Sequence, residues 1–261
     1  MAKATSEELL AARIVFRAVL PVIKVLLEDV PKLGQKFAGV TAKVQFVAKN
    51  DPEDAACCLQ FTDGALEVVP GLAENPDLTL RFSSVAKMNA FFAGKPALPW
   101  ISGLFSHFGL LVKIMTVLLA MKLMQPNAKP KTEDEKKLKV KLTVYMISTA
   151  LSQLNKSGDE EMVKWTTKQP ERIYQWSCEP EGVAAYLRIK AGKSKAGRGY
   201  YTRRKPFVHL KFDGATNALP VLSNSIDMIQ AMAKGMIVID GSPEYAAVLG
   251  NFMVRIARLV S

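Results

Sequence analysis

Apolar and polar positions alternate in a similar way along two short stretches of this chain. NPDLTLRF, residues 75–82, and KPFVHLKF, residues 205–212, each place a proline before alternating large apolar and polar side chains. Such alternation is typical of a half-buried β-strand. One match of this kind has little specificity, so its value depends on whether the flanking segments repeat as well.

The segments that follow the two strands repeat in the same order. Residues 83–95 have a helical pattern that ends at Gly94, and residues 213–235 have one that ends at Gly235. A glycine after the last periodic residue is a common helix C-terminus. The first copy then runs through a proline-containing loop to the apolar residues 108–124. The second runs through a short strand, 236–240, to a helix at 242–260.

The segments before the two strands correspond as well. Residues 44–71 and 163–192 contain alternating apolar runs, with turns predicted at Asp63-Gly64 and at Glu181-Gly182. Amphipathic helices are predicted before them, over residues 6–37 and 132–156, the second starting with Thr132 and Glu135 in capping-box spacing. Residues 125–137, QPNAKPKTEDEKK, have the composition of a linker. The sequence therefore predicts two copies of one α+β module, residues 1–127 and 128–261, rather than a chance recurrence of generic patterns.

These motifs resemble the sterol carrier protein 2 (SCP2) domain. The resemblance is carried by the Asp63-Gly64 hairpin, PDLTL at 76–80 and Gly94-Lys95 in copy one, and by Lys234-Gly235 and IVIDG at 237–241 in copy two. It implies that each copy is a five-stranded sheet with helices packed on one face and a hydrophobic tunnel for fatty acyl chains, sterols or related lipids. No residue role transfers by letter. Copy one departs from the pattern at ALPWISGLF, 97–105, which puts its last strand in question.

The helix predicted over residues 105–124 is apolar over most of its circumference. Lys113 and Lys122 interrupt it, and it is short for a membrane span. One apolar stripe can pack on the sheet, which leaves the other for a tunnel wall, a dimer contact or an interdomain contact. Methionine suits a plastic interior, although on a helix it is more often an ordinary core residue. The candidate ligand-binding residues are Trp100, Phe105, Phe108, Leu111, Met115, Leu118, Met228 and Met232, with copy one as the preferred site.

Charge is unevenly distributed along the chain. The net charge of the 261 residues is +11, and residues 126–261 carry 22 Lys and Arg against 13 Asp and Glu. The most basic segment is residues 190–205, KAGKSKAGRGYYTRRK. It is compatible with a solvated hairpin extension, with docking to an anionic membrane, and with nucleic-acid binding, although no nucleic-acid motif supports the last. The candidate membrane-docking residues are Lys193, Lys195, Arg198, Arg203, Arg204 and Lys205.

The sequence offers little for catalysis or for metal binding. His107 and His209 lie in or beside apolar segments, without a nearby acid or nucleophile in sequence. The cysteines Cys57, Cys58 and Cys178 form neither a disulfide framework nor a paired metal motif, which favours a reducing cytoplasm. Charged residues interrupt the first apolar run, unlike a secretory signal.

The sequence thus predicts a non-enzymatic, cytoplasmic protein with no cofactor and no metal. Its predicted activity is the binding or transfer of a hydrophobic small molecule or lipid, with docking on an anionic membrane surface at the membrane periphery. The alternative is a protein-interaction or dimerisation module with collapsed cavities, accessory to an enzyme of lipid metabolism. A homodimer is a candidate assembly, and nucleic acid is not expected as a partner.

Overall fold

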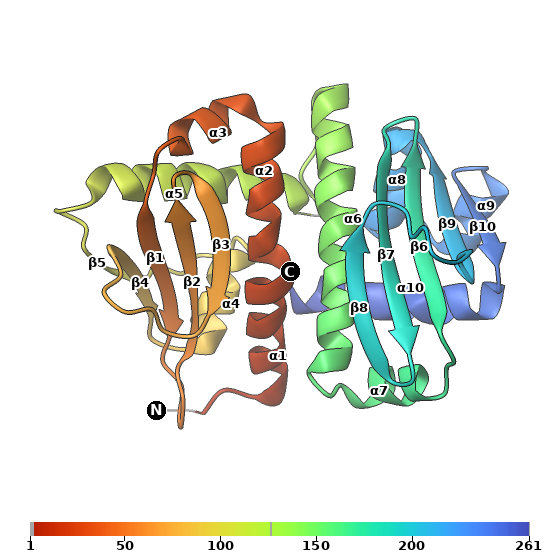
Figure 1. Cartoon of the computed structure of the whole chain (residues 1–261), viewed down its shortest axis with the longest axis horizontal. Coiled ribbons are helices and arrows are strands. Elements are labelled where there is room, and N and C mark those ends of the chain that lie inside the picture. Colours follow the sequence, from red (N-terminus) through yellow and green to blue (C-terminus); the bar gives the residue numbers. More distant parts are fainter. Residues whose placement is uncertain (1–2, 126, 261) are drawn as a thin grey trace. The chain divides into compact units, whose positions relative to one another are not determined.

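The computed structural model of the chain describes residues 3–125 and 127–260. They form two compact units: unit 1 is residues 3–125 together with residues 259–260, and unit 2 is residues 127–258. Each unit is a mixed α+β arrangement around a five-stranded sheet (Figure 1). This architecture confirms the predicted fold class.

Unit 1 begins with helices and continues into its sheet. Thr5 caps the first helix, because its hydroxyl accepts a hydrogen bond from the Glu8 amide at 3.2 Å and the Glu8 carboxylate accepts one from the Thr5 amide at 2.8 Å. The helices are α1 Ser6–Ile14, α2 Ile23–Asp29, α3 Pro31–Phe37, α4 Val85–Phe92 and α5 Phe108–Ala120, with a π-helical turn at Val15–Val19 and 3-10 turns at Leu20–Val22 and Met121–Met124. The strands are β1 Ala42–Ala48, β2 Ala55–Thr62, β3 Ala65–Pro70, β4 Leu78–Phe82 and β5 Trp100–Ser102.

Unit 2 begins with the long helix α6, which starts where the sequence predicts. The Thr132 hydroxyl accepts from the Glu135 amide at 3.1 Å. The helices are α6 Glu133–Lys156, α7 Glu160–Thr167, α8 Gly214–Leu222, α9 Met228–Ala233 and α10 Pro243–Leu259. The strands are β6 Arg172–Glu179, β7 Val183–Lys190, β8 Lys193–Arg198, β9 Val208–Asp213 and β10 Ile237–Gly241.

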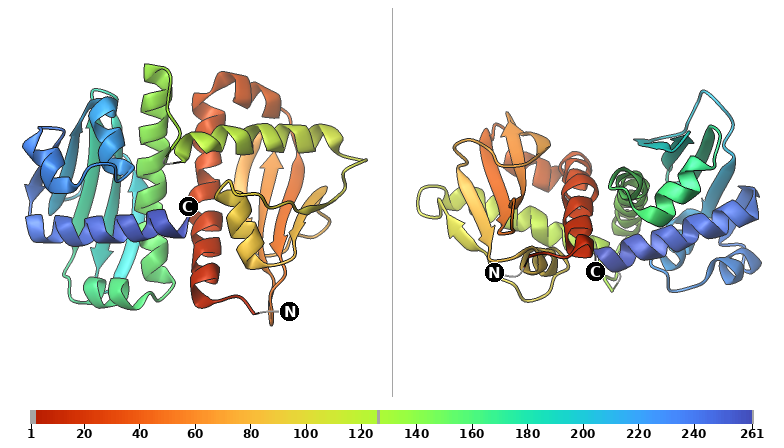
Figure 2. Two further views of the ribbon diagram at one scale, coloured as in Figure 1. Left: turned by 180° about the vertical axis from the view of Figure 1, so that it is seen from behind. Right: turned by 90° about the horizontal axis from the view of Figure 1, so that it is seen from below.

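The two sheets have the same strand order. Unit 1 is ordered β3-β2-β1-β4-β5, and unit 2 read in the same sense is β8-β7-β6-β9-β10. The central pairs β1–β4 and β6–β9 are parallel, and the other neighbours are antiparallel. Within each unit the helices pack on one face of the sheet (Figure 2). The strands that open the sequence comparison, β4 and β9, occupy equivalent positions.

The predicted correspondence of the turns is wrong. Asp63 and Gly64, both with positive φ, join β2 to β3, and the turn in the same place in unit 2 is Ala191-Gly192, which joins β7 to β8. Glu181-Gly182 lies one hairpin earlier, between β6 and β7. The sequence comparison matched the second turn of one unit to the first of the other, because only strand pairing shows which turn joins which strands.

The last strand of unit 1 is present although its sequence departs from the expected pattern. β5 pairs with β4 over three residues, as β10 pairs with β9. Gly103 directly follows β5 and Gly241 is the last paired residue of β10; a Cβ on Gly103 would meet the carbonyl oxygen of Asp77, and one on Gly241 would meet that of Phe207. Close backbone approach therefore requires glycine at both positions.

None of the helices in the described parts of the chain combines the length and apolar character needed to cross a bilayer. This agrees with the sequence-based reading of residues 108–124.

Candidate functional site

Helix α5 of unit 1 buries only a narrow stripe. Ile114 and Val117 are 1% and 2% exposed, and the helix lies near α2 and α3. Phe108, Val112 and Leu119 are 62%, 49% and 55% exposed. An apolar helix that is buried on one side only leaves a surface that water solvates poorly.

The segment before α5 carries further exposed apolar side chains. Leu98, Trp100 and Phe105 are 93%, 77% and 98% exposed. Trp100 lies on β5 opposite Arg81. Phe105 lies before the helix, which begins at Phe108, so its place on the predicted helical stripe is wrong. The chain turns here, with Gly103 at a φ of +83° and the His107 amide bonded to the Gly103 carbonyl.

The remaining predicted ligand residues occupy two places. Leu111, Met115 and Leu118 are half-buried on α5. Met228 and Met232 belong to α9 of unit 2, where Met228 is half-buried and Met232 is exposed. The unit 1 residues thus lie on one helix and on the strand and turn before it, and the two methionines belong to a different unit.

The basic segment of unit 2 is the edge strand β8 and the loop that follows it. Arg198 faces α6, with its guanidinium carbon 5.0 Å from the centre of the Tyr145 ring. Lys193 and Lys195 alternate with Ser194 and therefore point to the opposite, helix-free face. Arg203, Arg204 and Lys205 lie exposed in the loop. The predicted docking residues are therefore divided among three places.

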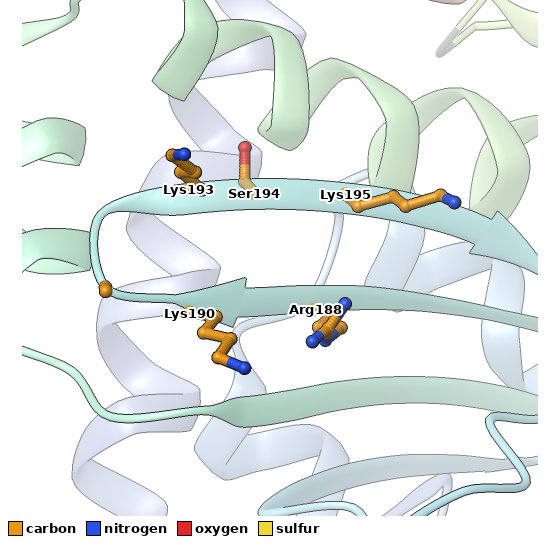
Figure 3. A pocket seen from close by; sticks show the side chains of 6 residues that line it. Arg188, Lys190, Lys193, Ser194 and Lys195 are labelled. Carbon is orange, nitrogen blue, oxygen red and sulfur yellow. The ribbon is translucent and has the colours of Figure 1, made fainter.

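Two cations of the neighbouring strand join the lysines of β8. Arg188 lies opposite Lys195 and Lys190 opposite Lys193 in the β7–β8 hairpin. These four side chains, with Ala191 and Ser194, line a hollow of about 330 Å³ (Figure 3). Arg188 was not among the predicted residues. Its alternation with Lys190 was a usable signal, but its approach to β8 depends on strand register.

Glu171 supplies the carboxylate beside this hollow. Its Oε1 accepts from Arg188 Nε at 2.7 Å, and its Oε2 lies 3.8 Å from both Lys190 Nζ and an Arg204 nitrogen. The hydrogen bond from Arg188 lowers the pKa of Glu171 below its ordinary value. The carboxylate is therefore ionised at neutral pH.

A buried glutamine fixes the loop that follows β8. Gln175 Nε2 donates to the carbonyls of Trp176, Ala185 and Gly199 at 3.1, 2.8 and 3.2 Å, and its Oε1 accepts from the Tyr201 amide at 2.9 Å. All four bonds go to the backbone, so the side chain acts as a fixed strut between the central strand and the loop.

Unit 1 contains the same arrangement around Gln45. Its Nε2 donates to Phe46, Cys57 and Gly71 at 3.0, 3.0 and 3.1 Å, and its Oε1 accepts from the Ala73 amide at 2.8 Å. Sequence reasoning missed both glutamines. The signal was a glutamine before a large aromatic residue in each copy, VQFV and YQWS.

The tyrosines of the basic segment are engaged within unit 2. The Tyr200 hydroxyl donates to Glu179 at 2.6 Å, and the Tyr201 ring packs edge-on against Tyr186 at 5.0 Å. These contacts hold both rings along the helix-free face of the sheet.

His209 is half-buried on this face and interacts with Ser177, whose Oγ lies 2.8 Å from His209 Nε2. Burial lowers the pKa of His209, and Lys211 adds to this effect. The His209 imidazole is thus held in a polar contact with Ser177.

The three cysteines are enclosed within their units. Cys57, Cys58 and Cys178 are all buried free thiols. Adjacent strand residues point to opposite faces, yet both Cys57 and Cys58 are buried: Cys58 shares its face with Gln45, which holds the crossing loop at Gly71 and Ala73 over that side of the sheet. Burial raises the pKa of Cys57 and of Cys178 to about 12, which makes both poor nucleophiles.

Comparison with known proteins gives matches in structure only. No protein-family model matches the chain. No curated protein matches it either.

The sterol carrier protein domain 2 of Helicoverpa armigera is 22% identical, with a TM-score of 0.32. The match covers 44% of this chain and 89% of the Helicoverpa domain. A UbiJ-SCP2 ubiquinone synthesis protein is 14% identical, with a TM-score of 0.30. The match covers 44% of this chain and 96% of the UbiJ-SCP2 chain. The sec-alkylsulfatase Pisa1 from Pseudomonas sp. is 11% identical over 63% of this chain, with a TM-score of 0.28. This chain spans 31% of the sulfatase. At these values the function has to be argued from the chain's own residues.

Proposed function

We propose that the chain consists of two SCP2-like modules and binds a hydrophobic ligand, such as a sterol, a fatty acyl chain or a related lipid, at α5 of unit 1. The repeated strand order and the two equivalent glutamine struts support the duplication. The SCP2-like motifs in both copies support the kind of module.

The observation that carries the proposed function is the unpacked apolar surface of α5 and the segment before it. Large apolar side chains gain roughly 1.5–3 kcal/mol each when they leave water completely. Phe108, Val112 and Leu119 are about half exposed or more, so roughly half of this gain is still available to a ligand. An acyl chain or a ring system that lies along α5 would cover the exposed stripe of Phe108, Val112 and Leu119, on the side of the helix away from the buried Ile114 and Val117.

A second candidate function has its own support. Leu98 and Phe105 are 93% and 98% exposed, which means that they project from the surface rather than line a concavity. Projecting apolar side chains also suit a protein partner or a second copy of the chain.

Docking of the basic loop on an anionic membrane belongs to the first proposal, because a lipid carrier has to meet its donor bilayer.

Native mass spectrometry, followed by organic extraction and lipid analysis, tests the proposal. Phe108→Glu changes an exposed residue of α5, and Ile229→Glu is its control, because Ile229 is 80% exposed in unit 2. We expect a lipid at about one per chain in the wild type and in the control, and its loss in Phe108→Glu.

The alternative gives a different pattern. A ligand-free dimer that Phe108→Glu converts to a monomer would establish the interaction module. A ligand-free monomer, with no difference between the two variants, would refute both functions.

A further inference from the structure

The helix-free face of the β7–β8 hairpin concentrates positive charge. Lys190 lies directly opposite Lys193, and Arg188 directly opposite Lys195. In Figure 3, Arg188 and Lys190 extend from one strand, and Lys193 and Lys195 extend from the other. Like charges at directly opposed positions destabilise a sheet, so two such pairs in succession oppose folding of this hairpin.

The hairpin has too few carboxylates to offset these charges. Glu171 is shared by Arg188, Lys190 and Arg204, and its side chain is only 19% exposed. Lys193 and Lys195 form no ion pair within the described parts of the chain. Four cations therefore line the hollow with one carboxylate at its border, and two of the cations are uncommitted.

Unit 1 shows that the fold does not require this charge. In the equivalent β2–β3 hairpin, the pairing places Gln60 opposite Glu67 and Thr62 opposite Ala65 on the corresponding face. Lysines often protect edge strands from further pairing. Unit 1, however, has an edge strand of the same length without a cation. Edge protection alone does not account for four cations.

The hairpin is also held rigidly from behind. The Ser194 hydroxyl lies 3.2 Å from the Ser152 hydroxyl and accepts from Asn155 Nδ2 at 3.2 Å, and Asn155 also donates to the Gly192 carbonyl at 2.8 Å. The Thr166 hydroxyl donates to Asn155 Oδ1 at 2.7 Å. This buried network fixes β8 on α6, so the lysines project from a preorganised backbone.

We propose that this hollow is a binding site for a multiply charged phosphate group, such as a diphosphate or a pair of phosphomonoesters. One phosphomonoester carries at most about two negative charges, which leaves part of the cationic surplus uncompensated. Two phosphate groups carry about three to four negative charges, which matches the net charge of about +3 that four cations and one carboxylate leave at the hollow. The hollow, of about 330 Å³, is open to solvent, so its charge rather than its enclosure argues for two phosphate groups.

The contacts of the aromatic residues disfavour nucleic acid. Single-stranded nucleic acid is held by base stacking as well as by charge. Tyr200 is bonded to Glu179 and Tyr201 is packed on Tyr186, so both rings are already engaged within unit 2. The site does not depend on lipid binding at α5, because it lies in the other unit and uses charge instead of apolar area.

Isothermal titration calorimetry of the full chain with sodium pyrophosphate tests the site, with sodium chloride at equal ionic strength as the reference. The test variant is Lys193→Gln with Lys195→Gln. The matched control is Lys32→Gln with Lys36→Gln, which removes two exposed lysines from α3 of unit 1. We expect the test variant to lose at least about tenfold in pyrophosphate affinity, and the control to stay within about twofold.

A second arm identifies the source of the phosphate. Phosphatidylcholine vesicles with and without phosphatidylinositol 4-phosphate are sedimented with the protein. Binding to the phosphoinositide vesicles that the test variant loses assigns the headgroup of a lipid. Pyrophosphate binding without vesicle binding assigns a soluble ligand.

The proposal is overturned if neither probe binds better than its reference, or if both double variants lose affinity equally. Tighter binding of a duplex oligonucleotide than of pyrophosphate also overturns it. These outcomes are separate from lipid extraction at α5, so either proposal can fail alone.

Discussion

Replacing the buried glutamine of unit 2 tests what holds the loop over the sheet. Gln175 is 0% exposed, and all four of its hydrogen bonds go to the backbone. Gln175→Leu keeps the approximate size of the side chain and removes every bond. The Gly199 carbonyl and the Tyr201 amide then lose the only partner that the described parts of the chain give them.

The expected loss follows from those two groups. Each buried polar group left without a partner costs about 1–3 kcal/mol. Both loop residues are half-buried, so water replaces part of the loss, and we expect Gln175→Leu to lower the free energy of unfolding by about 2–4 kcal/mol. Gln45→Leu should cost less, about 1–3 kcal/mol, because Gly71 is exposed and its carbonyl can bond to water.

Urea unfolding measures both effects. Trp165 and Trp176 belong to unit 2, whereas Trp100 of unit 1 is 77% exposed and changes its surroundings little on unfolding. Tryptophan fluorescence therefore reports mainly on unit 2, and far-ultraviolet circular dichroism reports on both units.

Gln60→Leu is the control, since Gln60 is a partly exposed strand glutamine without a side-chain hydrogen bond in the described residues. Its effect should stay within about 0.5 kcal/mol. If Gln175→Leu unfolds within the same range as Gln60→Leu, the glutamine strut does not stabilise the loop and the reasoning is refuted.

Two further predictions concern charge and thiols. Lys195→Glu turns the like-charge pair with Arg188 into an opposite-charge pair, so we expect the unfolding free energy in low salt to rise by about 0.5–1 kcal/mol; a decrease would contradict this. Cys57 and Cys178 have pKa values of about 12 in the folded chain against 9.0 for a free thiol. The unfolded chain therefore releases these protons first, and stability should fall as pH rises from about 9 to about 12, by roughly 1.4 kcal/mol per pH unit per thiol. Urea midpoints at pH 8 and pH 10.5 under reductant measure the fall, and Cys178→Ala should lose the part that Cys178 contributes; an unchanged midpoint would show that the thiols ionise in the folded state.

The sequence by itself determined the local structure and its repetition. Alternation in residues 75–82 and 205–212 predicted β4 and β9, and the Thr132 and Glu135 spacing predicted the start of α6. The glycines that end the helical patterns marked the order of elements. These features depend on neighbours a few residues apart, and short-range sterics and hydrogen bonds are written in the local sequence.

Only the tertiary structure decided which residues meet. The turn at Ala191-Gly192, and not Glu181-Gly182, corresponds to Asp63-Gly64, because strand pairing fixes the match. Arg188 joins Lys195, and Gln175 reaches the Tyr201 amide, for the same reason. A strand pattern specifies which side chains share a face, but register between strands is set by the packing of the whole sheet. The cationic hollow and the glutamine struts are products of that register, which the linear sequence does not express.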